Sequence, residues 1–485
     1  MKKINLGFLT LLSLSTFTTY GQTTVTKEQK EVIVSLDKKK DHYGDVSKKI
    51  WDLAEVGYME VKSSAILEEE LEKEGFTLEK GVAGIPTAFV ATYGKGKPEI
   101  SILAEYDALP GMAQEAVPER KVIEGQKAGH ACGHHLFGTG SVAAAIAVKE
   151  WLKQNGKTGT IKLMGCPAEE GGSGKVYMVR EGVFKNSDIV LHWHPGDHNS
   201  ANPMSSLANI SAKFRFYGVA AHAAGAPEKG RSALDGVEAM DYMVNMMREH
   251  VPQDTKIHYV ITRGGEAPNV VPAFAEVYYY ARHSNRDVVK GVWERIMEAA
   301  KGAAMGTGTK VEVEVTGGAY DLLPIESLSR VLYKNLEAVG GVSYTPEEIS
   351  FSEKIIASLT TSEGAKPTYT DAAAVTPFSA NPEALGGSTD VGDVSWAVPT
   401  VGFGAATWVP GTPAHSWQAV AAGGTDIGKK GMMVASKTLA LTAIDLFKDP
   451  ALIEKAHADW LKARGANFKY DAMVGDRKPA LDYRK

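Results

Sequence analysis

Three short apolar runs, each followed by acidic or metal-binding residue types, constrain the fold of this chain most strongly. The runs are Glu99–Ala104, Thr160–Cys166 and Ile189–Leu191. Helical patterns lie between them, including an Ala- and Val-rich stretch that follows Gly138 and reaches Lys153. Strands that alternate with helices predict an α/β sheet with parallel strands. In such sheets, the residues that follow the strands gather at one edge, where ligands bind.

Four polar side chains stand just beyond these runs, and we expect them to lie together at that edge. They are Asp107, Glu169, Glu170 and His194. Each has a simpler explanation on its own, because an acid can close a strand-end turn, adjacent acids usually face solvent, and a histidine can belong to the core. Their positions after successive strands favour a shared site instead.

The pattern changes between residues 207 and 317. Ser211–Tyr217 alternates strictly between two residue classes, as a sheet with one solvated face requires. The segments that follow predict the order strand–helix–strand–strand–helix–strand, which describes a separate small α+β domain. We therefore expect a catalytic domain formed by residues 22–206 and 318–485, with residues 207–317 inserted into it.

The first 21 residues have a different character from the rest. Lys2 and Lys3 precede a mostly apolar run, Ile4–Phe17, and small and polar residues follow as far as Gly21. This pattern predicts a secretory signal peptide over residues 1–21, and therefore a periplasmic or secreted protein. A membrane anchor is the weaker alternative, because the run is short and interrupted by polar residues. We expect no membrane attachment after cleavage.

Composition excludes some classes of partner. Hydrophobic residues make up 44% of the 485 residues, charged residues 23%, and the formal net charge is −5. Such a chain can bury a large core without help from disulfides. Acidic and basic residues are mixed, and no basic block suited to phosphate backbones occurs, so nucleic acid is not an expected partner.

Histidines cluster beside these carboxylates. Six of the thirteen histidines fall in two short windows, residues 130–135 and 192–198, and the first window also contains Cys132. The Cys132-Gly133-His134 sequence alone would more often be loop structure. Cysteine, histidine and glutamate together, however, are the ligand types that zinc-like divalent metals favour. The combination predicts a metal site, in which either His192 or His194 could serve.

The adjacent Glu169 and Glu170 suit metal-assisted hydrolysis. One carboxylate can bind a metal ion, while its neighbour stays free to accept a proton from a metal-bound water. The same group can later return that proton to a departing amine. No Gly-x-Ser-x-Gly sequence is present, which argues against a serine hydrolase. The Gly171–Lys175 segment superficially resembles a phosphate loop, but Val176 follows the lysine, and we interpret it as a turn and helix start.

Four segments in order resemble one enzyme family. They are Gly129–His134, Pro167–Gly171, His194 and Thr412–Ser416. Together they are similar to the aminoacylase/carboxypeptidase branch of the dizinc metallopeptidases, which includes hippurate, auxin-conjugate and aminobenzoyl-glutamate hydrolases. The resemblance covers essentially the whole mature chain. It implies a mixed-sheet α/β catalytic domain with an inserted α+β satellite domain.

The resemblance also implies roles for single residues in the metal centre. The five positions that match the family's ligands to two divalent metal ions are Cys132, His134, Glu170, His194 and His415. Glu169 matches the catalytic base, and the register of the preceding segment favours His194 over His192. Asp107 follows the family's Asp-Ala-Leu-Pro pattern and is expected to orient a ligand. Zinc is the expected metal, with manganese or cobalt as alternatives.

The inserted domain carries three further matches. In the family, the residue that corresponds to His222 helps to hold the developing oxyanion, and those that correspond to Asn269 and Arg282 bind a substrate carboxylate. An arginine suits a carboxylate because its guanidinium can donate two parallel hydrogen bonds. The satellite domain also forms the dimer contact in many relatives, so a homodimer is expected.

Two departures leave an alternative open. His135 stands where relatives usually have Asp or Asn, and Cys166 stands where some have Gln. Because Cys166 is close in sequence to Glu169, it could approach Cys132 in space. In an exported protein, a Cys132–Cys166 disulfide is then the alternative to a metal-binding thiolate.

We expect the chain to hydrolyse the amide bond between an acyl or aroyl group and an amino acid. The resemblance favours aminobenzoyl-glutamate, which would yield aminobenzoate and glutamate. A dipeptidase or carboxypeptidase that scavenges peptides is the first alternative. One component of a heteromeric amidohydrolase, or a metal-dependent binding protein, is the second.

Overall fold

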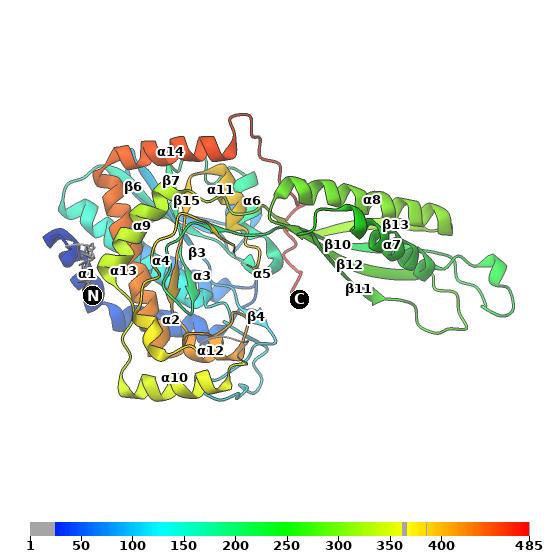
Figure 1. Cartoon of the computed structure of the whole chain (residues 1–485), viewed down its shortest axis with the longest axis horizontal. Coiled ribbons are helices and arrows are strands. Elements are labelled where there is room, and N and C mark those ends of the chain that lie inside the picture. Colours follow the sequence, from blue (N-terminus) through cyan, green and yellow to red (C-terminus); the bar gives the residue numbers. More distant parts are fainter. Residues whose placement is uncertain (1–24, 361–365, 385, 485) are drawn as a thin grey trace, which may run out of the picture.

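A computed structural model of the chain describes residues 25–360, 366–384 and 386–484. The expected signal peptide, residues 1–21, lies outside them. Figure 1 shows two parts: a larger part, which we call the catalytic part after the domain expected above, and a narrower part that projects from it. No helix among the described residues has the length and apolar character needed to cross a membrane.

The larger part is built on a mixed six-stranded sheet in the order β1-β2-β6-β3-β7-β15. Within it β6, β3, β7 and β15 run parallel to one another, whereas β1 and β2 are antiparallel to their neighbours. The strands of this sheet are β1 (Thr77–Lys80), β2 (Phe89–Lys95), β3 (Glu99–Ala104), β6 (Gly159–Gly165), β7 (Ile189–Leu191) and β15 (Thr400–Val401). The parallel strands come from both sides of the insert in sequence, so residues before 207 and after 317 share one sheet.

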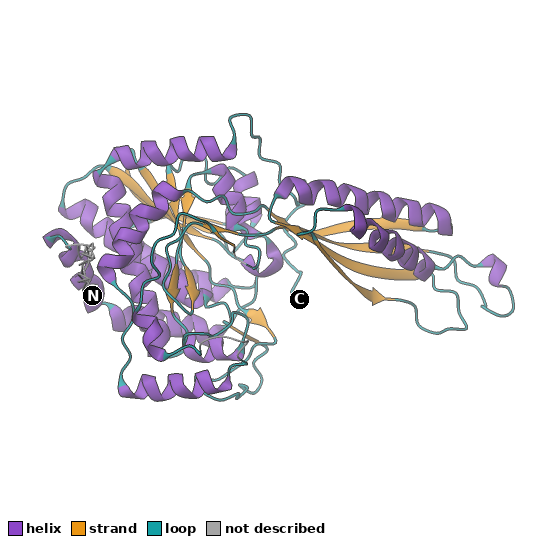
Figure 2. Ribbon diagram, viewed as in Figure 1, coloured by secondary structure: helices purple, strands orange, loops and turns teal. Residues whose placement is uncertain are grey.

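Helices surround this sheet (Figure 2). The helices of the larger part are α1 (Lys27–Lys38), α2 (Lys40–Leu53), α3 (Val61–Lys73), α4 (His134–Gln154), α5 (Glu169–Gly172), α6 (Gly174–Arg180), α9 (Glu326–Val339), α10 (Pro346–Ser358), α11 (Val391–Ala397), α12 (Trp417–Gly423), α13 (Asp426–Lys448) and α14 (Pro450–Arg464). The apolar helices α4 and α13 pack against each other, and α4 also covers β3 and β6. Short two-stranded pairs complete this part: β4 (Leu109–Pro110) with β5 (Ala128–Gly129), β8 (His194–Gly196) with β16 (Gly404–Ala406), and β9 (Met204–Ser205) with β14 (Glu383–Ala384).

The start of α4 corrects one sequence-based expectation. The helical pattern predicted a start after Gly138, but α4 begins at His134. Gly133 precedes it with φ +75°, a left-handed conformation that glycine adopts without strain. A Cβ at Gly133 would also overlap the Pro195 ring. The glycine therefore lets the chain turn sharply between Cys132 and the helix, which brings both candidate ligands to the same place.

The projecting part is a four-stranded antiparallel sheet with two helices. Its order is β11-β12-β10-β13, and α7 and α8 pack against β10 and β12. The bounds are β10 (Ala208–Tyr217), α7 (Ala233–Met247), β11 (Lys256–Arg263), β12 (Phe274–His283), α8 (Arg286–Thr307) and β13 (Lys310–Ala319). This is the strand–helix–strand–strand–helix–strand order that the sequence predicted, with β13 reaching two residues beyond 317. We call this part the satellite domain.

Candidate metal centre

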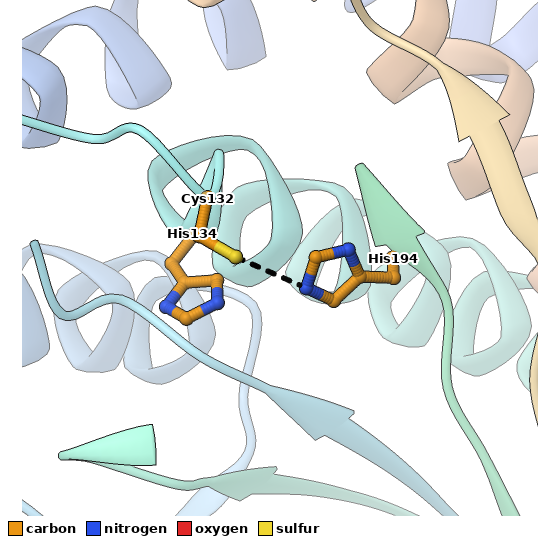
Figure 3. A group of neighbouring side chains, drawn as sticks. All are labelled: Cys132, His134 and His194. Carbon is orange, nitrogen blue, oxygen red and sulfur yellow. Dashed lines mark hydrogen bonds between the residues drawn. The ribbon is translucent and has the colours of Figure 1, made fainter. Parts of the chain in front are cut away.

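The five candidate ligands converge at the carboxyl edge of the larger sheet. Ligand atoms of Cys132, His134 and His194 lie within 4.8 Å of one another, as do those of Cys132, Glu170 and His415. Figure 3 shows the first group, with Sγ of Cys132 facing Nε2 of His194 at 3.5 Å. In the second group, Nε2 of His415 lies 3.2 Å from Oε1 of Glu170. Cys132 belongs to both groups, so the two form one continuous cluster.

Hydrogen bonds orient two of the histidines so that Nε2 faces the cluster. Nδ1 of His134 donates to Oδ1 of Asp107 at 2.8 Å, and Nδ1 of His194 donates to the Pro195 carbonyl at 2.7 Å. In the neutral ring with its proton on Nδ1, Nε2 carries the lone pair, and this is the form that binds a metal. Asp107 also accepts the backbone N–H of Glu170 at 2.9 Å through its other oxygen. Asp107 thus holds two candidate ligands at once.

The electrostatic environment of the cluster favours a bound cation. Burial, together with Glu170 and Glu169, raises the pKa of the Cys132 thiol, so a thiolate there needs a neighbouring cation. Burial opposes charging of His134, but Cys132, Asp107 and Glu105 outweigh it and raise the pKa of that imidazole. Sulfur, nitrogen and oxygen donors converge here, most of them buried and His415 exposed. The donor types and their directions fit divalent metal ions.

Glu169 lies beside the ligands with a different environment. Burial, and then the charge of Glu170, raises the pKa of the Glu169 carboxyl well above its usual value. Ligand atoms of Glu169, Glu105 and His134 lie within 4.8 Å of one another. A carboxyl group whose pKa is raised in this way takes up a proton more readily than an exposed one, as a general base must.

A pocket of about 230 Å³ opens on these residues and reaches the satellite domain. From the catalytic part it is lined by Glu169, Glu170 and His415, and from the satellite domain by Arg282 and Asn209. Arg282 and Asn209 are directly opposed on β12 and β10. The guanidinium of Arg282 lies over the Tyr280 ring, 5.0 Å from its centroid. The pocket therefore combines the metal-ligand cluster with one cationic side chain.

His222 and Asn269 do not reach this pocket. They lie together in two loops, where the Ala223 N–H donates to the Asn269 carbonyl at 3.0 Å. These loops follow β10 and precede β12, at the satellite-domain end away from the catalytic part (Figure 1). Phe274 begins β12 eight residues before Arg282, which corresponds to roughly 26 Å of strand. Within one chain, the structure brings Arg282 to the metal-ligand cluster but leaves His222 and Asn269 at the opposite end of the sheet.

Sequence reasoning missed a buried ionic chain behind the ligands. Oε2 of Glu105 lies 3.0 Å from Nε2 of His134, and its other oxygen pairs with Nζ of Lys175 at 2.6 Å. Lys175 also pairs with Asp390 at 2.7 Å, and the side chains of Glu105, Lys175 and Asp390 are all buried. Its position directly after β3 and two residues before Asp107 could have indicated Glu105, and both carboxylates reach His134. Nothing local in the sequence indicates that Lys175 and Asp390 meet.

The structure also decides between the interpretations of the cysteines and the remaining histidines. Cys132 and Cys166 are both buried free thiols, and the Cys166 thiol donates to the Met164 carbonyl at 3.2 Å. His135 pairs with the Gly423 carbonyl at 3.0 Å rather than with a candidate ligand. His192 lies outside both ligand groups, and burial lowers its pKa to about 3. The disulfide alternative is therefore not formed.

Comparisons with known proteins agree with this architecture. A family model described as an M20 peptidase dimerisation domain matches residues 207–307. The chain is 40% identical over 448 residues to a p-aminobenzoyl-glutamate hydrolase component of Escherichia coli K12, covering 88% of this chain and 93% of that protein. It is 28% identical to the Xaa-Arg dipeptidase of Mus musculus, covering 86% and 89%. A Bacillus subtilis protein described as a dinuclear metal-binding peptidase of the M20 family superimposes with a TM-score of 0.56 at 15% identity, covering 86% and 99%, which supports the fold.

Proposed function

The chain belongs to the M20 family of metal-dependent amidohydrolases and peptidases, and we propose that it cleaves aminobenzoyl-glutamate or a closely similar aroyl amino acid. The observation that carries the proposal is the shared pocket, in which the metal-ligand cluster and Glu169 face Arg282. A hydrolytic centre and a cationic side chain in one pocket suit a substrate whose amide bond has a carboxylate on its amine side. The identity to a component of p-aminobenzoyl-glutamate hydrolase supports the aroyl group.

Two divalent metal ions, which we propose to be zinc, would be held by Cys132, His134, Glu170, His194 and His415. The thiolate and imidazole donors favour zinc over harder cations, although manganese and cobalt also accept such ligands. When bound, the ions would polarise the amide carbonyl and lower the pKa of a water molecule. Asp107 would keep His134 and Glu170 in place for this purpose.

Glu169 would transfer a proton from the attacking water to the amide nitrogen. As a carboxylate, it accepts a proton from the attacking water while the oxygen bonds to the amide carbon. As a carboxylic acid, it then donates that proton to the amide nitrogen, so that the C–N bond breaks and the amine leaves. Its burial beside Glu170 raises its pKa, which favours uptake of the proton from the attacking water.

Arg282 would bind the carboxylate of the departing amino acid. It lies on β12 at the pocket, opposite Asn209, which offers an amide as an additional polar group. A guanidinium and a carboxylate can form two parallel hydrogen bonds, which fix orientation as well as charge. This contact would place the scissile amide over the metal-ligand cluster.

His222 would act in the pocket of a second copy of the chain. Nδ1 of His222 accepts the backbone N–H groups of Ala224 and Gly225 at 3.2 and 3.0 Å. The proton must therefore sit on Nε2, which is free to donate to a developing oxyanion. Because His222 and Asn269 lie far from their own metal-ligand cluster, a homodimer is the arrangement that could use them.

Apolar side chains on the satellite domain support this dimer. β11 is an edge strand of the sheet, and Val260 and Ile261 are exposed on it. Tyr242 and Met246 are exposed on α7. Edge strands with exposed apolar residues readily pair with another chain. The family model that matches this domain is also described as a dimerisation domain.

Mixed dimers test the exchange of His222. Glu169→Gln and His222→Ala chains should each be inactive alone. If His222 acts in the partner's pocket, random mixing should restore about a quarter of wild-type activity, because each mixed dimer holds one complete site. No restoration in mixtures that demonstrably exchange chains would contradict this arrangement.

A substrate panel tests the proposed function itself. The purified, zinc-loaded protein should prefer aminobenzoyl-glutamate over N-acetyl and N-benzoyl amino acids and over dipeptides. The similarity to a dipeptidase makes dipeptides the main competitor, and a clear preference for them would reject the aroyl substrate. Activity only after addition of a second polypeptide would instead indicate a heteromeric enzyme, an arrangement to which the Escherichia coli relative points because its name describes one component of a hydrolase.

Export is proposed from the sequence of residues 1–21 alone. The charged start, short apolar run and small residues near Gly21 are typical of a secretory signal peptide. Sequencing the N-terminus of the protein recovered from its natural host should find a chain that starts near Gln22. A chain that retains Lys2 and Lys3 would rule this out.

A further inference from the structure

The turn that carries Glu169 and Glu170 is conformationally strained. Ala168 and Ser173, on either side of α5, have φ of +56° and +59°, and Gly171 within it has φ +87°. A non-glycine residue in this left-handed region costs roughly 1–2 kcal/mol. Such a turn persists only when its surroundings hold it. The contacts that hold it therefore control the positions of the proposed base and of one metal ligand.

Side chains from three distant segments hold the backbone of this turn. Glu60 accepts the Ala168 N–H at 2.8 Å, and the Tyr58 hydroxyl donates to the Gly172 carbonyl at 2.6 Å. Asp107 accepts the Glu170 N–H at 2.9 Å. The carbonyl of Glu170 receives two donors from the end of the described chain: the Tyr483 hydroxyl at 2.9 Å and the Arg484 guanidinium at 2.7 Å.

Residues 465–484 form a segment that we call the strap. It leaves α14, crosses the junction between the catalytic part and the satellite domain, and ends beside α5 (Figure 1). Along the way the Tyr470 hydroxyl donates to Asp393 at 2.7 Å, and Arg180 donates to the carbonyls of Gly475 and Arg477 at 2.8 Å.

The strap is also bonded to the satellite domain. Asp471 pairs with Lys290 of α8 at 2.9 Å, and the Arg477 guanidinium donates to the Val315 carbonyl of β13. The strap therefore links the metal-ligand turn to the domain that carries Arg282.

The Tyr483 side chain packs into a specific site on the catalytic part. Its ring meets the Tyr58 ring edge to face, with centroids 5.6 Å apart. A Cβ at Gly57 would overlap the Tyr483 hydroxyl, and one at Gly172 would lie 3.2 Å from it. Arg484 stacks over the Tyr483 ring, with its guanidinium carbon 4.8 Å from the centroid. Two glycines and the Tyr58 ring thus shape a specific site for Tyr483, which a loosely attached tail would not need.

We propose that Tyr483 and Arg484 are positioning residues that set the geometry of Glu169 and the metal affinity of Glu170. Their two hydrogen bonds fix the peptide plane that follows Glu170, while Asp107 fixes the plane that precedes it. The Glu170 side chain is then held toward His415 and Cys132 before metal binds. Metal binding therefore does not have to supply the energy of the strained backbone. The inference rests on the proposed metal centre.

The test compares strap variants by zinc affinity and by steady-state kinetics. The main variant combines Tyr483→Phe with Arg484→Ala, which removes both donors but keeps the ring in its site. Lys478→Ala is the matched control, because this strap residue also loses one positive charge. Tyr470→Phe is a second control, because it loosens the strap at Asp393, far along it from the turn. Zinc titration against a chromogenic chelator gives the affinity of each site without reference to activity.

The double variant should bind one of two zinc ions roughly 10- to 100-fold more weakly, as expected when the partner of a metal ligand is removed. At saturating zinc its kcat should fall while KM changes little, because Glu169 is displaced and Arg282 is not. Both controls should keep wild-type zinc affinity. Unchanged zinc affinity and kcat in the double variant would overturn the inference, as would an equal loss in Tyr470→Phe. If the wild-type protein itself fails to bind two zinc ions, the proposed function fails instead.

Discussion

The carboxylate of Asp107 accepts a hydrogen bond from Nδ1 of His134 at 2.8 Å, and this contact decides which nitrogen of the histidine faces the ligand cluster. A metal ligand of this kind depends on its partner for both tautomer and ring orientation. The same carboxylate holds the backbone of Glu170. Asp107 therefore contacts two of the proposed ligands although it is not itself one of them.

Replacing Asp107 with Ala should weaken zinc binding by roughly 10- to 100-fold, because His134 loses its orienting acceptor and Glu170 loses its N–H partner. Asp107→Asn should lose less, since its amide oxygen can still accept one of the two bonds. Chelator competition measures both affinities. The hypothesis fails if Asp107→Ala binds zinc as tightly as the wild-type protein.

Replacing Glu169 with Gln should leave two zinc ions bound and lower kcat by roughly 10²- to 10⁴-fold, the range attributed to a general acid–base. Glutamine keeps the size and one acceptor oxygen of Glu169 but cannot take up the proton. Metal analysis and turnover should be measured on the same preparation. Loss of a metal ion would mean that Glu169 is a ligand, and near-normal kcat would remove its proposed role.

Replacing Arg282 with Ala should lower kcat/KM for a carboxylate substrate by roughly 10- to 100-fold, the value of one charge-assisted contact. The loss should appear mainly as a higher KM, because the substrate is held less tightly before reaction. The substrate control is the matching carboxamide, which the wild-type protein should already cleave poorly. Arg282→Ala should treat the two substrates almost alike, whereas an unchanged preference for the carboxylate would place its recognition elsewhere.

The buried carboxyl of Asp393 should make stability depend on pH. Burial raises its pKa to about 7, against the hydrogen bonds that it accepts from the Tyr320 N–H and the Tyr470 hydroxyl. Unfolding restores a pKa of about 3.9, so the folded state holds the proton more tightly. This contribution to stability is fully present below about pH 4 and is lost as pH rises to about 7, at up to roughly 1.4 kcal/mol per unit.

Denaturant unfolding of metal-free wild type and Asp393→Asn checks this sign. Other groups titrate in both proteins, so the informative quantity is the difference in the free energy of unfolding. As pH rises from about 4 to about 7, the free energy of unfolding of Asp393→Asn should increase relative to that of the wild type. Parallel pH profiles would show that Asp393 does not titrate in this range.

Local sequence predicted many of the strands and helices, and it placed several candidate ligands after strands of one sheet. The apolar run Glu99–Ala104 matches β3, and Ile189–Leu191 matches β7, because a fully buried strand is recognisable from its own residues. Cys132 and His134 are close neighbours in sequence, and Glu170 and His194 follow strands of one sheet. Parallel strands end at one edge, so residues after them converge without any detail of packing.

The sequence could not determine where the satellite-domain candidates lie relative to the cluster. His222, Asn269 and Arg282 matched one family pattern equally well, yet only Arg282 faces the pocket of its own chain. Strand register and the direction of the insert decide which end of a sheet meets the catalytic part. Those quantities depend on pairings between residues far apart in the chain, such as Asn209 with Arg282 and Asn209 with Ala319, which no local pattern records.

What the sequence determined by itself, then, is the set of residue types that follow each strand, and with it the donor types that the proposed metal centre offers. Only the tertiary structure decided which of them touch: that Cys132 is a free thiol turned toward His194, that Lys175 is buried between Glu105 and Asp390, and that Tyr483 and Arg484 reach back to Glu170. The physical reason is that strand and helix periodicity depend on neighbouring residues. Ion pairs, and hydrogen bonds from side chains to a distant backbone, depend instead on side-chain directions in segments that meet only after the chain has folded.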